Sequence, residues 1–211
     1  MFLPKVEIVQ DASFNLTAVR AASAICADVV ADSSIKGLNM NIPGLGKVTK
    51  DESIGWYYSE PVKLEVLKDK ECRVVLDGYD EDAAKEDFHS TIANFLSIPH
   101  SVLKDAEVHI YRYYQDVNAQ CEPDDEEFLL IESPGEVWKH VDLGDEPIVS
   151  RCPYGAKGVY VSLVCNCDWE PEHGLQIVFK NGAQVTKVGP YDGHLTNKDE
   201  DVVYQIGRAH V

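Results

Sequence analysis

The chain has 211 residues and a formal net charge of −17, so it is strongly acidic and long enough for one well-buried core. An excess of carboxylates repels nucleic-acid phosphates and anionic membrane surfaces, and no apolar run reaches the roughly 18 residues that span a bilayer. Composition therefore argues against nucleic-acid and membrane partners, and it suits either simple solubility or attraction to a basic protein partner.

The cysteines and the first residues bear on the compartment. Six cysteines at irregular spacings suit reduced thiols better than a disulfide framework. Residues 1–16 lack the basic and the continuous apolar regions of a secretory signal. We therefore expect a cytoplasmic protein. Its negative charge also has a simpler explanation, a solvated acidic surface without any partner.

The first predicted elements follow the Pro/Gly-rich residues 41–46. Alternating apolar residues predict a strand over 62–67, and the polar turn Lys68–Lys70 leads into a second strand over 72–76. Three aromatic residues precede this hairpin: Trp56, Tyr57 and Tyr58. We expect them to cover the sheet, although their rings could also line a binding face.

Two helices are predicted next. Acidic residues Asp80–Asp82 precede a helix that continues through Leu96 and is stopped by Pro99. Ser101 is the expected N-cap of the second helix, and Tyr114 is expected to flank its buried stripe. That stripe is formed by apolar side chains at helical spacing: Leu103, Ala106, Ile110, Tyr113 and Val117.

A third, short helix is predicted over residues 134–141. Ser133 and Glu136 have the spacing of a capping box, and Pro134 suits the first helical position. Trp138 is expected to anchor this helix to the sheet.

The remaining residues predict one extended segment and three strands. Residues 146–152 are extended, and apolar and polar residues alternate over 159–166. Residues 175–179 repeat the alternation before Asn181-Gly182, a pair that favours a two-residue type I′ hairpin loop. The predicted pairs are Lys180 with Ala183, Phe179 with Gln184, Val178 with Val185, Ile177 with Thr186 and Leu175 with Val188. Together these elements predict an α+β fold, an antiparallel β-sheet with two to three helices packed on one side, in a single domain over residues 40–205.

The loop between the last long strand and the hairpin holds the densest set of potentially reactive side chains. Together with two residues of a later loop, the candidate functional residues are Cys167, Asp168, Trp169, Glu170, Glu172, His173, Asp192 and His194. Pro171 restricts the backbone beside Trp169, and we expect this indole to fold inward and fix the loop.

These residue types allow two kinds of site. Thiolates and imidazoles are the ligands that zinc prefers, and one set offers them: Cys165, Cys167, His173 and His194. Their C-x-C spacing is not that of familiar zinc sites, and both cysteines fall on the buried strand face, where a free cysteine behaves as a small hydrophobe. The carboxylates could instead form an acid–base pair or bind a hard cation: Asp168, Glu170, Glu172 and Asp192. We expect no metal or other cofactor, and a hydrogen bond from His173 to loop carboxylates such as Asp168 and Glu170.

Several motifs resemble a known family. Residues 165–175 (C-N-C-D-W-E-P-E-H-G-L) and 189–195 (G-P-Y-D-G-H-L) are similar to the signature of a bacterial family, domain of unknown function 6985. Segments that begin at Gly46 (G-K-V-T-K-D-E), Trp56 (W-Y-Y-S-E-P) and Glu136 (E-V-W-K-H-V) resemble it in the same order. The resemblance covers about residues 40–204 and implies a bacterial origin, but no activity.

Both ends of the chain fall outside this resemblance. Residues 1–39 do not resemble the family, so we expect the native protein to begin near Met40 and the preceding residues to be an upstream extension. An Ala-rich helix over residues 17–31 is the alternative. Residues 206–211 (I-G-R-A-H-V) match one translated frame of a common sequencing adapter, and we interpret them as read-through.

The sequence contains no G-x-S-x-G elbow, no phosphate-binding glycine loop and no H-E-x-x-H helix. We therefore expect a non-catalytic protein-binding module, for example an immunity-like antagonist of a basic protein. The alternative is a metal-dependent hydrolase centred on the loop Cys165–Gly174.

Overall fold

The structure, a computed structural model, describes residues 39–122, 128–155, 157–198 and 202–204. These residues all belong to one compact unit of the chain, Gly37–Val211. The alternative helix over residues 17–31 and the adapter-like residues 206–211 lie outside the described residues.

A nine-stranded β-sheet is the main element of the described residues. Eight strands follow one another in the spatial order β1 (Asn39–Ile42), β2 (Gly46–Lys50), β3 (Tyr57–Ser59), β6 (Val75–Leu76), β8 (Ile148–Arg151), β9 (Val159–Cys167), β10 (Leu175–Lys180) and β11 (Gln184–Gly189). The ninth, β7 (Val141–Asp142), pairs with β9, and β4 (Val62–Leu64) forms a separate hairpin with β5 (Lys70–Cys72). Neighbouring strands are antiparallel except β6 and β8, which are parallel.

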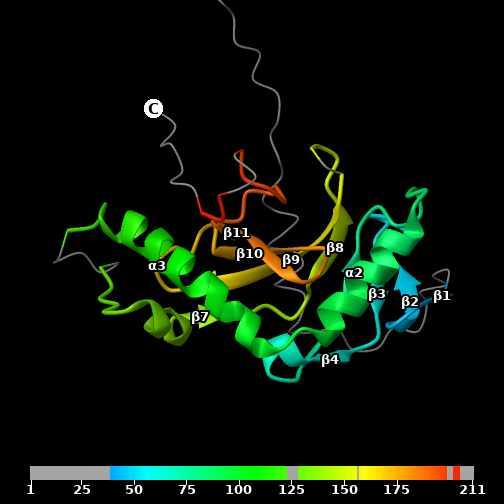
Figure 1. Cartoon of the computed structure of the whole chain (residues 1–211), viewed down its shortest axis with the longest axis horizontal. Coiled ribbons are helices and arrows are strands. Elements are labelled where there is room, and N and C mark those ends of the chain that lie inside the picture. The colour runs from blue at the N-terminus through cyan, green and yellow to red at the C-terminus, as the bar shows by residue number, and fades with distance from the viewer. Residues whose placement is uncertain (1–38, 123–127, 156, 199–201, 205–211) are drawn as a thin grey trace, which may run out of the picture. The chain divides into compact units, whose positions relative to one another are not determined.

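Two α-helices, α2 (Lys85–Ser97) and α3 (Lys104–Asn118), lie on the same side of this sheet, as Figure 1 shows. In the described part of the chain, three short 3-10 helices accompany them: η2 (Glu65–Leu67), η3 (His100–Leu103) and η4 (Pro134–Lys139). A mostly antiparallel sheet with its helices on one side confirms the predicted α+β class. Within the described ranges, no helix is both long and apolar enough to cross a bilayer.

The main core lies between the helices and the sheet. Helix α2 buries Phe88, Ile92 and Phe95. Phe95 meets Phe179 of β10 with the ring centroids 5.3 Å apart. Directly paired residues of neighbouring strands point to the same face of a sheet. Phe179 is paired with Val161 of β9, and both side chains lie in this core. Each such fully buried apolar side chain contributes about 1.5–3 kcal/mol to stability.

The predicted Asn-Gly turn forms and packs against α2. Asn181 and Gly182 both have positive φ angles, 52° and 68°. A Cβ on Gly182 would lie 2.1 Å from the carbonyl oxygen of Thr91 in α2, so only glycine fits there. Asn94 of the same helix donates from Nδ2 to the Asn181 carbonyl at 3.0 Å. The turn is therefore fixed by the helix layer as well as by its own dihedral angles.

The predicted register of this hairpin is wrong by one or two residues. Lys180 pairs with Gln184 instead of Ala183, and Ile177 pairs with Val188 instead of Thr186. An irregularity between Val178 and Phe179 shifts the register within the hairpin. A bulge adds a residue to one strand only. The predicted pairs are counted outward from a two-residue loop, which assumes equal numbers of residues in both strands. The apolar face survives the shift, since its predicted members all lie in the main core: Leu175, Ile177, Phe179 and Val188.

One of the two predicted helix starts is wrong. Ser101 lies inside η3, and α3 begins without a side-chain cap hydrogen bond. The start of the short helix is confirmed, with Ser133 at the N-cap position and Pro134 at the first helical residue, but Ser133 makes no side-chain cap hydrogen bond and η4 is a 3-10 helix that ends at Lys139. Glu136 instead accepts from the backbone N–H of Glu132 at 3.3 Å.

Two aromatic side chains near α3 add contacts that the sequence does not predict. Trp138 packs against the main core and also ties η4 to α3, because its Nε1 donates to Glu107 Oε1 at 2.8 Å. Tyr114 is buried rather than flanking the stripe, and its hydroxyl donates to the Leu129 carbonyl at 2.7 Å. The same hydroxyl accepts from the backbone N–H of Ile131 at 3.1 Å. The segment before η4 thus adds buried surface that helical periodicity does not reveal.

The hairpin predicted over residues 62–76 forms only in part. Glu65–Leu67 adopt a 3-10 turn instead of extending the strand, and the ladder β4–β5 is confined to residues 62–64 and 70–72. Lys68 and Asp69 have positive φ angles of 58° and 61°, so the chain turns back there.

Candidate functional site

The sheet face opposite the helices carries a buried row of polar side chains. Ser162 of β9, Gln176 of β10 and Lys187 of β11 are 4%, 1% and 2% exposed. Gln176 Nε2 donates to Ser162 Oγ at 2.8 Å, and Gln176 Oε1 accepts from Lys187 Nζ at 2.8 Å. The row therefore links three strands through hydrogen bonds that satisfy buried polar groups.

Lys187 also holds the loop that follows β11. Its Nζ donates to the carbonyl of His194 at 2.9 Å and to Asp192 Oδ1. With Gln176, these acceptors use all three N–H groups of the ammonium. Burial lowers the pKa of Lys187, while the hydrogen bond to Asp192 acts in the opposite direction. Sequence reasoning missed Lys187 because a strand lysine ordinarily points to solvent; its place shortly before the G-P-Y-D-G-H-L motif is the one available signal.

The two motif loops meet at one end of the sheet. The backbone N–H of Tyr191 donates to the His173 carbonyl at 3.2 Å. The first loop closes through Gly174, which has a φ of 62° and donates from its N–H to the Glu170 carbonyl at 2.9 Å. A Cβ on Gly174 would lie 2.5 Å from the Cys165 carbonyl oxygen. The glycine of this motif is therefore required by both its φ angle and the close approach of β9.

The two cysteines of the first motif point into the protein. Cys165 and Cys167 are 2% and 5% exposed, as the strand pattern predicts. Burial raises the pKa of each thiol to about 12. Both therefore remain protonated near neutral pH in the metal-free chain, which makes them poor nucleophiles.

Trp169 folds inward, which confirms the prediction. Its side chain is 5% exposed and packs edge-on against Tyr113 and Tyr114, with both centroid distances at 6.0 Å. Its Nε1 has no hydrogen-bond partner among the described residues. The indole thus fixes the loop to α3 through packing.

The polar residues of the first loop pair with one another and with His140, which directly follows η4. Asp168 Oδ2 lies 3.0 Å from His140 Nδ1. The partner of Asp168 is therefore His140 and not His173. Glu170 Oε1 lies 3.4 Å from His173 Nδ1 and accepts the backbone N–H groups of Glu172 at 3.2 Å and His173 at 3.3 Å. The expected pairing of His173 with a loop carboxylate is therefore present with Glu170 and absent with Asp168.

The structure does not bring together the four predicted zinc ligands. Across the described ranges, one group of three or more potential ligand atoms lies within 4.8 Å of one another, namely those of Glu170, Glu172 and His173. Cys165, Cys167 and His194 are not members of this group. His194 belongs instead to the loop anchored by Lys187.

A cavity of about 550 Å³ opens on the sheet face that carries the polar row. Ser162 and Gln176 contribute to its lining, and the second motif loop contributes Tyr191 and His194. Distant parts of the chain complete the wall: Trp56, Asp77 and Tyr154. Sequence reasoning treated Trp56 as sheet cover or binding face and did not single out Asp77, because nothing local connects these residues to residues 189–195.

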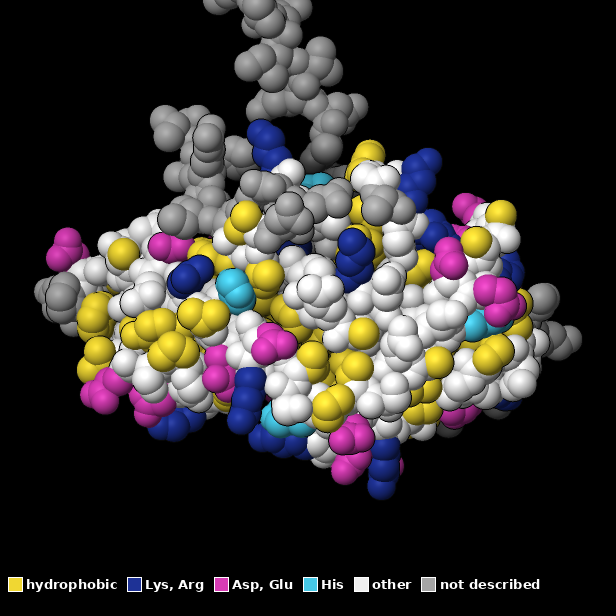
Figure 2. Space-filling model, viewed as in Figure 1, with side chains coloured by type: hydrophobic (Ala, Val, Ile, Leu, Met, Phe, Trp, Pro, Cys, Tyr) yellow, Lys and Arg dark blue, Asp and Glu magenta, His cyan; other side chains and the backbone are white. Residues whose placement is uncertain are grey.

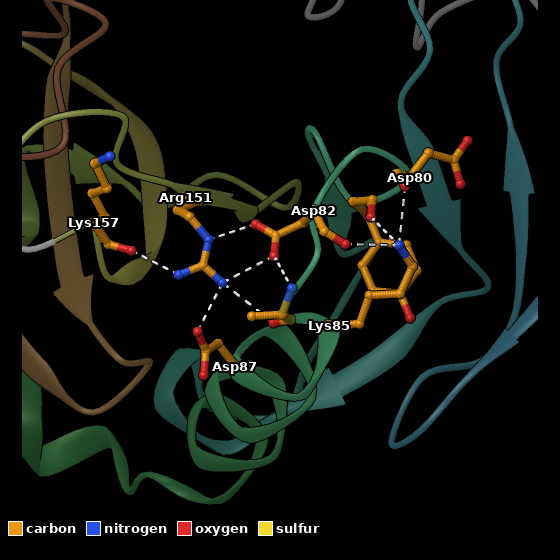
Figure 3. A network of polar contacts seen from close by, with 8 residues as sticks. Asp80, Asp82, Lys85, Asp87, Arg151 and Lys157 are labelled. Atoms are coloured by element: carbon orange, nitrogen blue, oxygen red, sulfur yellow. Dashed lines mark hydrogen bonds and ion pairs between the residues drawn. The ribbon is translucent and has the colours of Figure 1, made fainter.

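Arg151 lines the same cavity but is engaged elsewhere, as Figure 3 shows. Its guanidinium donates to Asp82 at 2.5 and 3.1 Å, to Asp87 at 2.8 Å and to the Lys157 carbonyl at 2.7 Å. The pKa of Asp82 is lowered, mainly by the hydrogen bond that it accepts from Arg151. This network ties β8 to the start of α2 and neutralises the arginine charge beside the cavity.

Lys85 closes the loop before α2 in a similar way. Its Nζ donates to three backbone carbonyls, those of Tyr79, Asp80 and Asp82, at 2.9, 3.0 and 3.0 Å (Figure 3). It also lies 4.9 Å from the centroid of the Tyr79 ring. The carbonyls and the ring therefore fix the ammonium in place.

Comparison with known proteins identifies the family of this chain. No curated protein and no solved structure matches the chain. Residues 44–195 match the family described as Domain of unknown function (DUF6985), and this range contains both motif loops and most of the cavity lining. The chain therefore belongs to the DUF6985 family.

Proposed function

We propose that this protein is a non-catalytic binding module that recognises a basic protein partner through the two motif loops at one end of its sheet. The main support for this proposal is the composition of the two loops, residues 167–174 and 189–195. They expose carboxylates and contain no Lys or Arg. The side chains of Asp168 and Asp192 are 65% and 46% exposed, and Glu172 is exposed as well. Such an acidic surface attracts a basic partner and accelerates its association.

The reactive side chains of the loops support binding rather than catalysis. The thiols of Cys165 and Cys167 are buried and protonated, and Trp169 packs in the core. Lys187 is fully hydrogen-bonded. Residues that could carry out chemistry are thus engaged in holding the loops, and Asp192 is paired with Lys187. The exposed carboxylates of Asp168 and Glu172 are then the main recognition groups.

The face that carries the two long helices shows, in its described part, no surface of a single charge sign that would compete with the loops. On the face that carries α2 and α3, acidic and basic side chains are interspersed (Figure 2). As part of the same proposal, we assign the protein to the bacterial cytoplasm. Five cysteines in the described ranges are free thiols, which suits a reducing compartment.

In the first step of the test, the purified full chain is used to capture binding partners. Each basic protein that is captured is then purified, and its affinity for the chain is measured by titration calorimetry. The dissociation constant should increase steeply with salt concentration, since the attraction is screened. Asp168→Asn/Glu172→Gln should weaken binding about tenfold, or about 1.4 kcal/mol. Glu60→Gln/Glu71→Gln, at two exposed positions far from the loops in sequence, is the matched control and should change it less than about twofold. Equal weakening in both variants, or no basic partner at low salt, would contradict the proposal.

A metal-dependent hydrolase is the second candidate function. The observation that favours it is the group formed by Glu170, Glu172 and His173, which combines two carboxylates with an imidazole. Protein purified without metal-affinity resin should then contain about one zinc per chain, and His173→Ala should remove it. Metal content below about one-tenth per chain would eliminate this candidate.

A further inference from the structure

We infer that the cavity on the sheet face opposite the helices binds an organic cation, an alkylammonium or guanidinium group, with Asp77 as its counter-ion and aromatic rings as its walls. The inference goes beyond the proposed function, because a free small cation would bind there without any protein partner. It rests on the cavity lining, on the partners of Asp77 and on the engagement of the neighbouring basic residues.

The cavity has the size and the mixed lining of a small-molecule site. Its volume of about 550 Å³ lies in the range of roughly 300–1,000 Å³ that is typical of ligand pockets. Three aromatic side chains line it, Trp56, Tyr154 and Tyr191. Aromatic faces attract ammonium and guanidinium groups, most strongly where water is excluded.

Asp77 is a half-buried carboxylate without a cationic partner within ion-pair distance in the described ranges. Its backbone N–H donates to the Val149 carbonyl at 3.0 Å, which fixes the residue at the end of β6. Burial raises the pKa of Asp77, a hydrogen bond from Trp56 opposes this, and Glu81 raises it further. A carboxylate removed from water without a counter-ion costs stability, which a bound cation would recover.

Two nearby aspartates show the contrast. Asp80 accepts from Lys50 at 2.7 Å, and Asp82 accepts from Arg151 at 2.5 Å. Both have a lowered pKa for that reason. Both of these carboxylates thus have a basic partner, whereas Asp77, the acidic residue that lines the cavity, has none within ion-pair distance among the described residues.

The basic residues around the cavity do not fill this role. Arg151 is held by Asp82 and Asp87, and Lys187 is held by its three acceptors beneath the loop. Lys198 and His194 also line the cavity, and both are exposed. Among the described residues that line the cavity, Lys198 is the lysine that could compete for Asp77, so its removal should strengthen the binding of an added cation.

The floor of the cavity offers a second contact. Ser162 Oγ accepts from Gln176, so the hydroxyl proton of Ser162 remains available to a ligand acceptor. A cation that carries a carbonyl or carboxylate, such as an amino-acid derivative, would satisfy both Asp77 and Ser162. A free small molecule and an arginine or lysine side chain of a protein both carry such a group.

The experiment follows the Trp56 indole N–H by NMR while the full chain is titrated with N-acetyl-arginine methylamide. The neutral isostere N-acetyl-citrulline methylamide is the ligand control, and it should bind at least about tenfold more weakly. Asp77→Asn should lose about tenfold in affinity for the arginine derivative with an unchanged circular dichroism spectrum. Lys198→Met should bind it more tightly than the unmodified chain does.

The source of the cation is distinguished by two further titrations. Tetramethylammonium tests a free small cation, and a short arginine-containing peptide tests a protein side chain. The variant Asp168→Asn/Glu172→Gln should bind the arginine derivative as before, so that this inference and the proposed function can fail independently. Equal affinity for the citrulline control, unchanged affinity in Asp77→Asn, or no indole shift by about 20 mM of any cation would overturn the inference.

Discussion

The indole of Trp169 lies edge-on against the ring of Tyr113, with the ring centroids 6.0 Å apart and the planes at 79°. Tyr113 in turn donates from its hydroxyl to the Gly174 carbonyl at 3.1 Å, so α3 holds both ends of the first motif loop. This pair makes the loop part of the core, although its outer residues are acidic and exposed.

Trp169→Ala should lower the free energy of unfolding by roughly 3 kcal/mol, because it removes a large buried side chain and leaves a cavity. Trp169→Phe is the matched control and should lose about half as much, since Nε1 has no partner within the described ranges and the phenyl ring retains much of the packing. Urea unfolding of the three proteins measures the difference. Loss of partner binding at unchanged stability would mean that Trp169 is a recognition surface instead.

Gly182→Ala should destabilise the fold by more than about 2 kcal/mol. Two causes add, the positive φ of 68° and the contact of 2.1 Å between the new Cβ and the Thr91 carbonyl. Gly55→Ala is the control that separates the two causes, because Gly55 has a φ of 79° but open space around the Cβ position. This substitution should lower the free energy of unfolding by about 1 kcal/mol. Thermal unfolding that shows equal effects for both variants would rule out the clash with α2.

Arg151→Met should lower the free energy of unfolding by about 2–3 kcal/mol, because it leaves the largely buried Asp82 carboxylate without its partner. Arg151→Lys should restore less than half, since an ammonium cannot reproduce the two-pronged contact. Arg73→Met removes a more exposed ion pair with Glu146 and should cost less than about 1 kcal/mol.

The pH dependence of the Arg151 effect has a defined sign. Arg151 lowers the pKa of Asp82 below its ordinary value of 3.8, so this stabilisation is present above that pH and is lost as the pH falls through the folded-state pKa. The difference between the unmodified chain and Arg151→Met should therefore shrink in strong acid. A constant difference in denaturant titrations across this range would contradict the assignment.

Cys165 and Cys167 should make the protein labile to alkali. Burial raises the pKa of each thiol from 9.0 to about 12 in the folded chain. Above pH 9 the unfolded chain loses these protons while the folded chain keeps them, so the free energy of unfolding falls as the pH rises. Each thiol contributes up to about 1.4 kcal/mol per pH unit in this window. In urea titrations from about pH 8 to 10.5, Cys165→Ala/Cys167→Ala should show a shallower decline, and an unchanged slope would disprove it.

The sequence by itself determined the α+β class, both long helices and the apolar faces of β9 and β10, because each follows from the local spacing of apolar residues. It also determined the inward Trp169 and the two motif loops by which the family is recognised. The tertiary structure decided the register of the β10–β11 hairpin, where a bulge adds residues to one strand. It alone revealed the buried Lys187, the Trp138–Glu107 bond, and the meeting of Trp56, Asp77 and Tyr191 at one cavity. These features join residues that are far apart along the chain or that break the local pattern, and periodicity carries no information about such partners.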